Sequence, residues 1–291
     1  METIGGQAVI EGVIIRNKNK IATAVRTKKG IITKSETFIS LTEKHSYLNI
    51  PIIRGTITFF EMLKIGINSL NYSASLLEDE NSAKEKKESN NRFYITASFS
   101  FMIAIAFFLF LPILITTKAL SIEKTAFYFN IITGIIRIIF FIAYVYIISF
   151  MKDVRRLFMY HGAEHKVINC YENNEKVNLK NARKYSTVHK RCGTSFLLVM
   201  FIVAIVSFSF IDLAAFYIIG STSMLIRTIT HLLFLPLVLG IAYEIIKASS
   251  KNNSAILKIV TYPGALLQKI TTSEPDDGMI NVAIAALQKI V

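Results

Sequence analysis

The sequence FLLVMFIVAIVSFSFIDLAAFYIIG at residues 196–220 decides the class of this protein. Its single charged side chain is Asp212. About 20 apolar residues in a helix cross a hydrocarbon core of about 30 Å, and this run exceeds that length. Comparable runs lie at residues 95–117, 129–150 and 224–246. We therefore predict an α-helical membrane protein with four transmembrane helices, and the lipid bilayer as its partner.

The composition favours a membrane protein over a soluble protein and over a nucleic-acid-binding protein. Hydrophobic residues make up 52% of the 291 residues, the mean hydropathy is +0.46 and tryptophan is absent. Such a chain is too apolar for an average soluble protein. The formal charge is +13. A strongly positive charge is also typical of nucleic-acid-binding proteins, but no zinc-finger spacing or interleaved basic and aromatic motif accompanies it here. We expect no nucleic-acid partner and attribute the charge to loops that face anionic lipid.

The loop charges predict an orientation. The loop at residues 151–195 holds ten Lys and Arg residues against four Asp and Glu residues, whereas the connections at 118–128 and 221–223 are short and carry little net charge. Basic loops stay on the cytoplasmic side of a membrane. Four crossings then place this loop and both termini in the cytoplasm of a multi-pass protein of the cell (inner) membrane.

Smaller elements are predicted at the N-terminus. β-Branched and apolar residues at 7–16, 20–27 and 31–39 favour a small antiparallel β-sheet. From residue 51 the apolar period becomes helical, but polar residues such as Glu61 and Lys64 interrupt it. We expect an amphipathic helix that lies against protein or the membrane surface and does not cross it.

These segments divide the chain into four parts. We expect a cytoplasmic β-rich region with the amphipathic helix, a charged linker, a transmembrane domain that contains the cytoplasmic loop 151–195, and a cytoplasmic helical tail. Their predicted ranges are 1–77, 78–92, 93–246 and 247–291. In the tail, Ser273 or Asp276 is expected to cap a helix.

Polar side chains interrupt the predicted transmembrane helices at Arg137, Asp212 and His231. A charge in lipid costs at least about 2.5–3.5 kcal/mol on insertion scales and is normally paired or turned inward. The three positions lie at similar depth if each helix crosses fully. We therefore expect an Arg137–Asp212 pair that fixes helix packing, with a proton or ion path as the alternative.

The loop between the second and third predicted crossings concentrates metal-binding residue types. Residues 161–192 hold three of the five histidines and both cysteines. The sequence HGAEH at 161–165 has the form H-x-x-E-H, which puts both histidines on one face if residues 154–171 are helical. A histidine and a cysteine then follow with H-x-x-C spacing. We predict a divalent metal site of zinc type with these candidate ligands: His161, His165, His189 and Cys192.

Three interpretations of this site differ in consequence. With three protein ligands and a water the site is catalytic, and Glu164 is the general base, as in inverted zincins. With four protein ligands it is structural and staples the loop to the ends of two transmembrane helices. Without a metal, the histidines are surface residues of a basic loop. Cys170 is a weaker ligand candidate and equally a packed apolar group.

Five motifs in order resemble the YqhQ-like family. They lie at residues 5–13, 51–55, 161–166, 189–195 and 271–277. This family consists of membrane proteins of unknown function, in bacteria and plastids, that are described as predicted metal-dependent enzymes. The resemblance implies a multi-span membrane protein with a metal, and it brings no substrate. In the family pattern proline usually follows His189 and arginine stands at position 273, where this chain has Lys190 and Ser273, while the metal-ligand types are intact.

The sequence thus predicts a metal-dependent hydrolase acting at the membrane surface, with Glu164 as its catalytic residue and a zinc-type ion as cofactor. The alternative is a non-enzymatic transporter or assembly scaffold in which the metal is a structural clip. Neither a phosphate-cradling glycine loop nor a nucleotide fingerprint occurs in the sequence.

Overall fold

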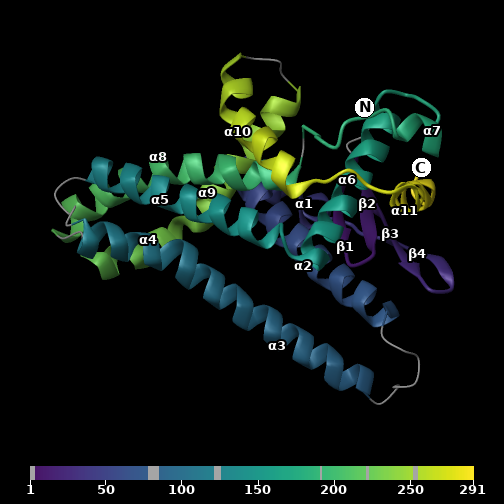
Figure 1. The fold of residues 1–291 in the computed structure, drawn as a ribbon. Coiled ribbons are helices and arrows are strands. Elements are labelled where there is room, and N and C mark those ends of the chain that lie inside the picture. Colours follow the sequence, from purple (N-terminus) through teal and green to yellow (C-terminus); the bar gives the residue numbers. More distant parts are fainter. Residues whose placement is uncertain (1–3, 78–84, 121–125, 191, 221–222, 252–254) are drawn as a thin grey trace.

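The computed structural model describes residues 4–77, 85–120, 126–190, 192–220, 223–251 and 255–291. Figure 1 shows a long helical bundle with a smaller body of strands and helices at one end. Within the described residues, four helical segments are long and apolar enough to cross a membrane. They are Tyr94–Ala119, Phe127–Ile148, Gly193–Ile219 and Met224–Ser249. The predicted fold class, a four-span helical membrane protein with a small N-terminal antiparallel sheet, is confirmed.

The first crossing is an irregular helix. α3 (Glu85–Ile105) continues through a π-helical turn, η2 (Ala106–Phe110), one α-helical turn, α4 (Leu111–Leu114), and a second π-helical turn, η3 (Ile115–Ala119). Pro112 lies between the two π-helical turns and has no N–H to donate to the preceding turn. We attribute the irregularity to this proline.

The other crossings are α5 (Ala126–Ile148), α8 (Gly193–Ile219) and α9 (Met224–Lys251). α8 is the central helix, because it packs against both α5 and α9. One apolar cluster joins α8 to α9 through buried residues such as Val199, Phe208 and Val238. A second joins α8 to α5 through Leu198, Phe201 and Val145.

The N-terminal sheet contains four antiparallel strands in the order β1-β2-β3-β4. They are β1 (Ile4–Val9), β2 (Gly12–Asn17), β3 (Lys20–Thr27) and β4 (Gly30–Thr37). The prediction of one strand over residues 7–16 is wrong, because the chain turns back at Ile10 and Glu11 and pairs Val9 with Gly12. Glu11 adopts φ 53°, the left-handed conformation that a tight hairpin turn requires.

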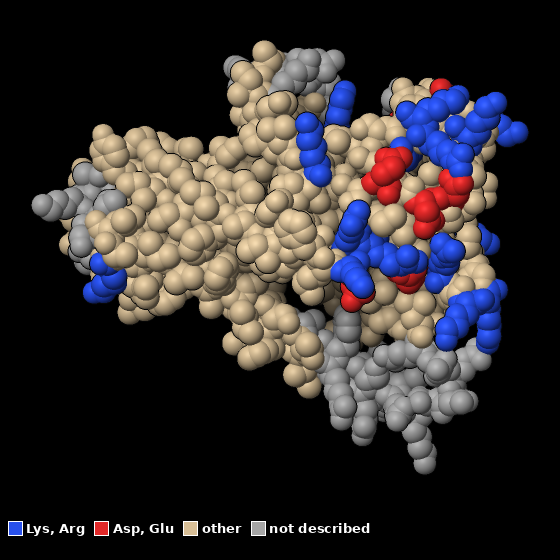
Figure 2. All heavy atoms as spheres, viewed as in Figure 1, with Lys and Arg blue, Asp and Glu red and all other residues tan. Residues whose placement is uncertain are grey.

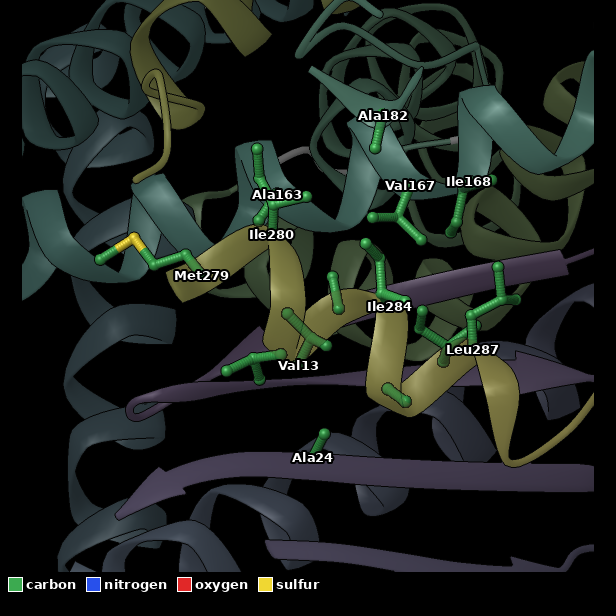
Figure 3. Packing of buried hydrophobic residues seen from close by; sticks show 14 of the residues in the cluster. Val13, Ala24, Ala163, Val167, Ile168, Ala182, Met279, Ile280, Ile284 and Leu287 are labelled. Atoms are coloured by element: carbon green, nitrogen blue, oxygen red, sulfur yellow. The ribbon is translucent and has the colours of Figure 1, made fainter. Parts of the chain in front are cut away.

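The sheet shares its core with two helices from distant parts of the chain. α6 (Lys152–Glu172) and α11 (Asp277–Gln288) pack on it together with the short α7 (Leu179–Ala182). Figure 3 shows α11 lying between the strands and α6, with Ile280 and Ile284 pointing into the shared core. We call the four strands with α6, α7 and α11 the peripheral unit. Asp276 caps α11 by accepting a hydrogen bond from the Met279 N–H at 2.8 Å, which confirms the predicted tail cap.

Two amphipathic helices connect the peripheral unit and the bundle. α2 (Ile53–Leu77) follows the short α1 (Leu41–Lys44) and η1 (Ser46–Leu48), packs against α9, and is the predicted amphipathic helix. α10 (Ala255–Thr271) packs against α8, and in Figure 1 it projects from the side of the bundle, across the bundle axis. Of the predicted linker, residues 78–84 lie outside the described part, and α3 begins at Glu85.

Charge is unevenly distributed over the molecule. In Figure 2 the Lys, Arg, Asp and Glu side chains gather over the peripheral unit, while the visible face of the bundle is almost entirely uncharged. This separation is expected if hydrocarbon surrounds the bundle and headgroups and water surround the other end.

Candidate metal centre

α6 presents the two histidines of the H-x-x-E-H sequence side by side. The helix covers this whole sequence, as predicted, and the imidazole centroids of His161 and His165 are 4.3 Å apart. Residues four apart on an α-helix lie on one face, one turn above the other. The geometry therefore allows both rings to bind one ion.

Cys192 completes a group of three. It is the N-cap residue of α8, and its Sγ lies 3.3 Å from Nε2 of His161. One ligand atom from each of His161, His165 and Cys192 lies within 4.8 Å of the others. Zinc–ligand distances of about 2.0–2.3 Å separate tetrahedral ligand atoms by about 3.3–3.8 Å. Small side-chain shifts would bring the three atoms to that spacing.

Backbone carbonyl oxygens orient both rings. Nδ1 of His161 lies 2.8 Å from the carbonyl oxygen of Thr271, and Nδ1 of His165 lies 2.5 Å from that of Thr187. A carbonyl oxygen only accepts hydrogen bonds, so each Nδ1 carries the proton and each neutral ring keeps its lone pair on Nε2. Burial also lowers the pKa of His165, which favours the neutral ring. The second nitrogen of a metal-binding histidine is usually held in this way.

Glu164 reaches the same place from between the two histidines. Its Oε2 lies 3.6 Å from Nε2 of His165 and 3.9 Å from Nε2 of His161, and the residue is only 2% exposed. Oε2 has no hydrogen-bond partner among the described residues. Burial raises the pKa of this carboxyl, because the charged form is poorly solvated there.

The sheet closes the site over Glu164. A Cβ atom on Gly6 of β1 would lie 2.8 Å from both Cγ and Oε1 of Glu164, and 2.5 Å from the carbonyl oxygen of Ile14. Only glycine leaves room for the carboxylate at this point. The first hairpin is therefore one wall of the site.

These atoms share one property, which is that they are electron donors. Two imidazole lone pairs, a sulfur and a carboxylate oxygen converge in a buried place. Bringing such atoms together without a proton or a cation is costly, because each has left water and repels the others. His, Cys and carboxylate are also the ligand types of zinc-type sites. The donor set fits a divalent transition metal.

Two of the candidate cysteine and histidine residues lie outside this group. The His189 ring is centred 5.6 Å from that of His165, but its Nε2 lies 3.2 Å from Oε2 of Glu172. The Gln268 side chain fixes the backbone of His189 by bonding to both its N–H and its carbonyl, at 2.8 and 2.9 Å. Cys170 is buried in the apolar core of the peripheral unit. Of its two interpretations, metal ligand or packed apolar group, the structure supports the second.

The tail passes along the site through its backbone. The Ser273 N–H donates to the Phe158 carbonyl at 3.0 Å, and a Cβ on Gly162 would lie 2.1 Å from the Ser273 carbonyl oxygen. The nearby Glu274 pairs with Lys166 at 2.7 Å. Because Ser273 is held by its backbone, these contacts do not depend on an arginine side chain at position 273.

A second buried polar cluster lies inside the bundle. Asp212 accepts hydrogen bonds from Arg227 at 2.9 Å and from Asn130 at 2.8 Å, and its other oxygen lies 2.9 Å from Nε2 of His231. The expected direct pair with Arg137 is replaced by these contacts. Nη2 of Arg137 lies 3.4 Å from the Leu109 carbonyl oxygen instead. Arg227, in the first turn of α9, forms the ion pair with Asp212.

Comparison with known proteins gives the family. The model of a family described as "Protein of unknown function (DUF1385)" matches residues 50–291. The chain belongs to the DUF1385 family. It is also 32% identical over 303 residues to a protein of Bacillus subtilis (strain 168) called "Uncharacterized protein YqhQ", covering 99% of this chain and 92% of that protein. No solved structure matches.

The DUF1385 match covers part of the site. His161, Glu164, His165 and Cys192 all lie within the matched residues, whereas Gly6 of the first hairpin precedes them. The hairpin lies within the longer similarity to the Bacillus subtilis protein, which covers almost the whole chain. The YqhQ-like resemblance of the sequence motifs is thereby confirmed, and the family carries no assigned activity.

Proposed function

We propose that this protein is a metal-dependent hydrolase that acts at the membrane surface, with a zinc-type ion held by His161, His165 and Cys192. The observation that carries the proposal is the convergence of two Nε2 atoms, one sulfur and a carboxylate oxygen that has no partner among the described residues. Three protein ligands with an open fourth position are typical of catalytic zinc sites.

The chain's own residues have separate roles in this proposal. The carbonyls of Thr187 and Thr271 hold the two rings with Nε2 toward the centre. Glu164 takes a proton from water and returns it to the leaving group, a role favoured by the burial that raises its pKa. When bound, an ion of this type polarises a substrate oxygen and acidifies water. The peripheral unit keeps bulk water away from the carboxylate.

We also propose the orientation that the loop charges predict. The peripheral unit, both termini and the site then face the cytoplasm, and the bundle crosses the inner membrane. The concentration of charged side chains over the peripheral unit supports this arrangement.

A second candidate is a structural clip in a non-enzymatic transporter or assembly scaffold. It is favoured by the number of segments that meet at the site. α6 supplies two histidines, the start of α8 supplies Cys192, and the end of α10 supplies the Thr271 carbonyl. With Glu164 as a fourth ligand, an ion would lock these segments together.

The first experiment measures the metal. Protein is purified from membranes without chelator, and zinc, iron, manganese and cobalt are quantified by mass spectrometry. We expect about one equivalent of a divalent metal per chain, and its loss in His165→Ala. Metal-free wild-type protein that also fails to take up added zinc would contradict both the hydrolase and the clip.

The second experiment separates the hydrolase from the clip. Cobalt(II) is substituted into the site, and azide is added while the visible spectrum is recorded. An open fourth position predicts a change of spectrum with azide, whereas a closed four-ligand site predicts none. Glu164→Gln should keep the cobalt and the azide response in the hydrolase, and should weaken cobalt binding in the clip. A panel of ester, amide and phosphodiester substrates is then compared between wild-type protein and Glu164→Gln.

A further inference from the structure

An apolar groove lies beside the candidate metal centre. It has a volume of about 300 Å³ and is lined by α5, α8 and α10. Every lining residue is apolar, and Ile142, Leu198, Ile202, Leu266 and Ile270 are among them. α5 and α8 are membrane-crossing helices, so this groove opens into the hydrocarbon layer.

The groove and the metal centre share two helices. Ile270 lines the groove, and the next residue, Thr271, accepts the hydrogen bond from the His161 ring. On α8, Leu198 lies six residues beyond Cys192, which is about 9 Å along the helix axis. The two features are therefore neighbours, with the groove on the membrane side.

The setting of α10 explains why a groove forms here. The helix projects across the bundle axis (Figure 1), as an amphipathic helix does when it lies in the plane of the membrane surface. Because α10 runs across α5 and α8, an apolar groove is left where the three helices meet. Lys269 is exposed in the last turn of α10, beside Ile270, where it can meet a phosphate of the headgroup layer.

We propose that this groove binds one acyl chain of a glycerophospholipid and so places the headgroup end of that lipid at the metal centre. The apolar lining and the hydrocarbon setting select the chain, and Lys269 selects an anionic headgroup. The cleavage part of the inference rests on the proposed function and deepens it, because it makes a membrane lipid the substrate class. Lipid binding itself does not depend on a metal.

The hydrolytic step on such a substrate balances with water alone. The oxygen of water bonds to the carbonyl carbon or phosphorus of one ester linkage, and the bond to the leaving oxygen breaks. The proton that Glu164 accepts passes to that leaving oxygen. No oxidant, reductant or further co-reactant is consumed.

Native mass spectrometry tests the binding. The protein is reconstituted in vesicles of phosphatidylglycerol and phosphatidylethanolamine, extracted into mild detergent and delipidated in steps. We expect one phospholipid to remain after the surrounding lipids are gone. Ile142→Trp fills the groove and should lower the retained lipid about tenfold, which corresponds to about 1.4 kcal/mol of binding free energy.

Matched variants keep this test interpretable. Ile139→Trp changes the same residue type on the same helix, at an exposed position outside the groove, and should retain lipid like the wild type. Ile202→Trp and Val206→Trp repeat the comparison on α8, in case substitution at Ile142 prevents folding. Equal retention in groove and control variants would overturn the proposal.

Photo-crosslinking tests where each end of the lipid lies. A phosphatidylglycerol with a diazirine in mid-chain should label the α10 peptide around Leu266, and one with the diazirine at the headgroup should label residues 161–165 or 192–195. Chain labelling between α2 and α3, or headgroup labelling away from the metal centre, would overturn it. The metal content of the same samples is measured. Lipid retained without metal refutes only the hydrolase, and metal bound without lipid refutes only the groove.

Discussion

The two buried carboxylates among the described residues, Asp212 and Glu164, have opposite surroundings. Asp212 in the bundle is surrounded by donors, because Arg227, Asn130 and His231 all bond to it. Glu164 in the peripheral unit is surrounded by acceptors, and its Oε2 has no hydrogen-bond partner among the described residues. A carboxylate whose bonds are satisfied holds a structure together. One that faces other electron donors needs a proton or a cation beside it.

Depth explains the difference. Asp212 lies in a membrane-crossing helix, where an unpaired charge is costly and nearly every such group is paired. Glu164 lies on α6, outside the membrane-crossing segments, at the junction between the bundle and the charged peripheral unit. We therefore propose that the bundle cluster serves helix packing and that the peripheral cluster serves chemistry.

The largest expected effect is on folding, from Asp212→Ala. The change leaves Arg227 and His231 buried without their carboxylate, and breaking such a buried pair costs about 3–5 kcal/mol. Denaturant unfolding in detergent measures the loss. Ser209→Ala, one turn away on α8, removes only a hydroxyl bonded to the Ile205 carbonyl and should be nearly neutral. If Asp212→Ala folds normally but loses its metal, the division between the two clusters is wrong.

The second effect is on metal affinity. Loss of an outer hydrogen-bond partner weakens metal binding about 10–100-fold. His165→Ala removes a proposed ligand itself, so we expect a larger loss of zinc affinity. His189→Ala is the matched control, because the His189 Nε2 faces Glu172 and not the group of three. Competition with a fluorescent zinc chelator measures both. Equal losses in the two variants would restore His189 as a ligand.

The third effect tests the wall that covers Glu164. Gly6→Ala places a methyl group 2.8 Å from that carboxylate and 2.5 Å from the Ile14 carbonyl, so we expect a loss of about 1–3 kcal/mol in stability. Gly5→Ala changes the neighbouring residue where nothing lies within 4 Å. Thermal unfolding of both variants should differ accordingly. A stable Gly6→Ala protein would show that the hairpin does not close the site.

The smallest effect concerns the link between the hairpin and α6. Arg156 donates to both carboxylate oxygens of Glu11, and the Tyr160 hydroxyl donates at 3.0 Å. The Arg156 side chain is 45% exposed, so Glu11→Gln should cost no more than about 1 kcal/mol. Glu36→Gln, in the exposed pair with Lys34, should change nothing measurable. A large loss of metal in Glu11→Gln would mean that this link positions α6.

Part of this picture could be predicted from the sequence. The crossings follow from the length of apolar runs such as residues 196–220, and the histidine pair follows from its spacing on a helix. The third member of the group could not be chosen between His189 and Cys192, because the loop between α6 and α8 has no periodic pattern. Only the fold shows that the N-cap of α8 brings Cys192 to His161.

Other features left no signal in the sequence. The oxygens of Thr187 and Thr271 that orient the rings belong to the backbone, which every residue has. The sequence argument paired Asp212 with Arg137 because the two residues lie at similar distances from the ends of their helices. The actual partner, Arg227, depends on how the helices are placed relative to one another, which the sequence does not show. The place of α11 between the strands and α6 also joins segments far apart in the chain.

The most direct test is the thermal unfolding of the wild-type protein after chelator treatment, with and without added zinc. If the Glu164 cluster is completed by a cation, zinc at about 100 times its dissociation constant should stabilise the fold by about 2.7 kcal/mol and raise Tm, with no rise in His165→Ala. Ser209→Ala, which leaves both buried clusters intact, should gain as much in Tm from zinc as the wild type does. A wild-type Tm that is the same with and without zinc would contradict the account.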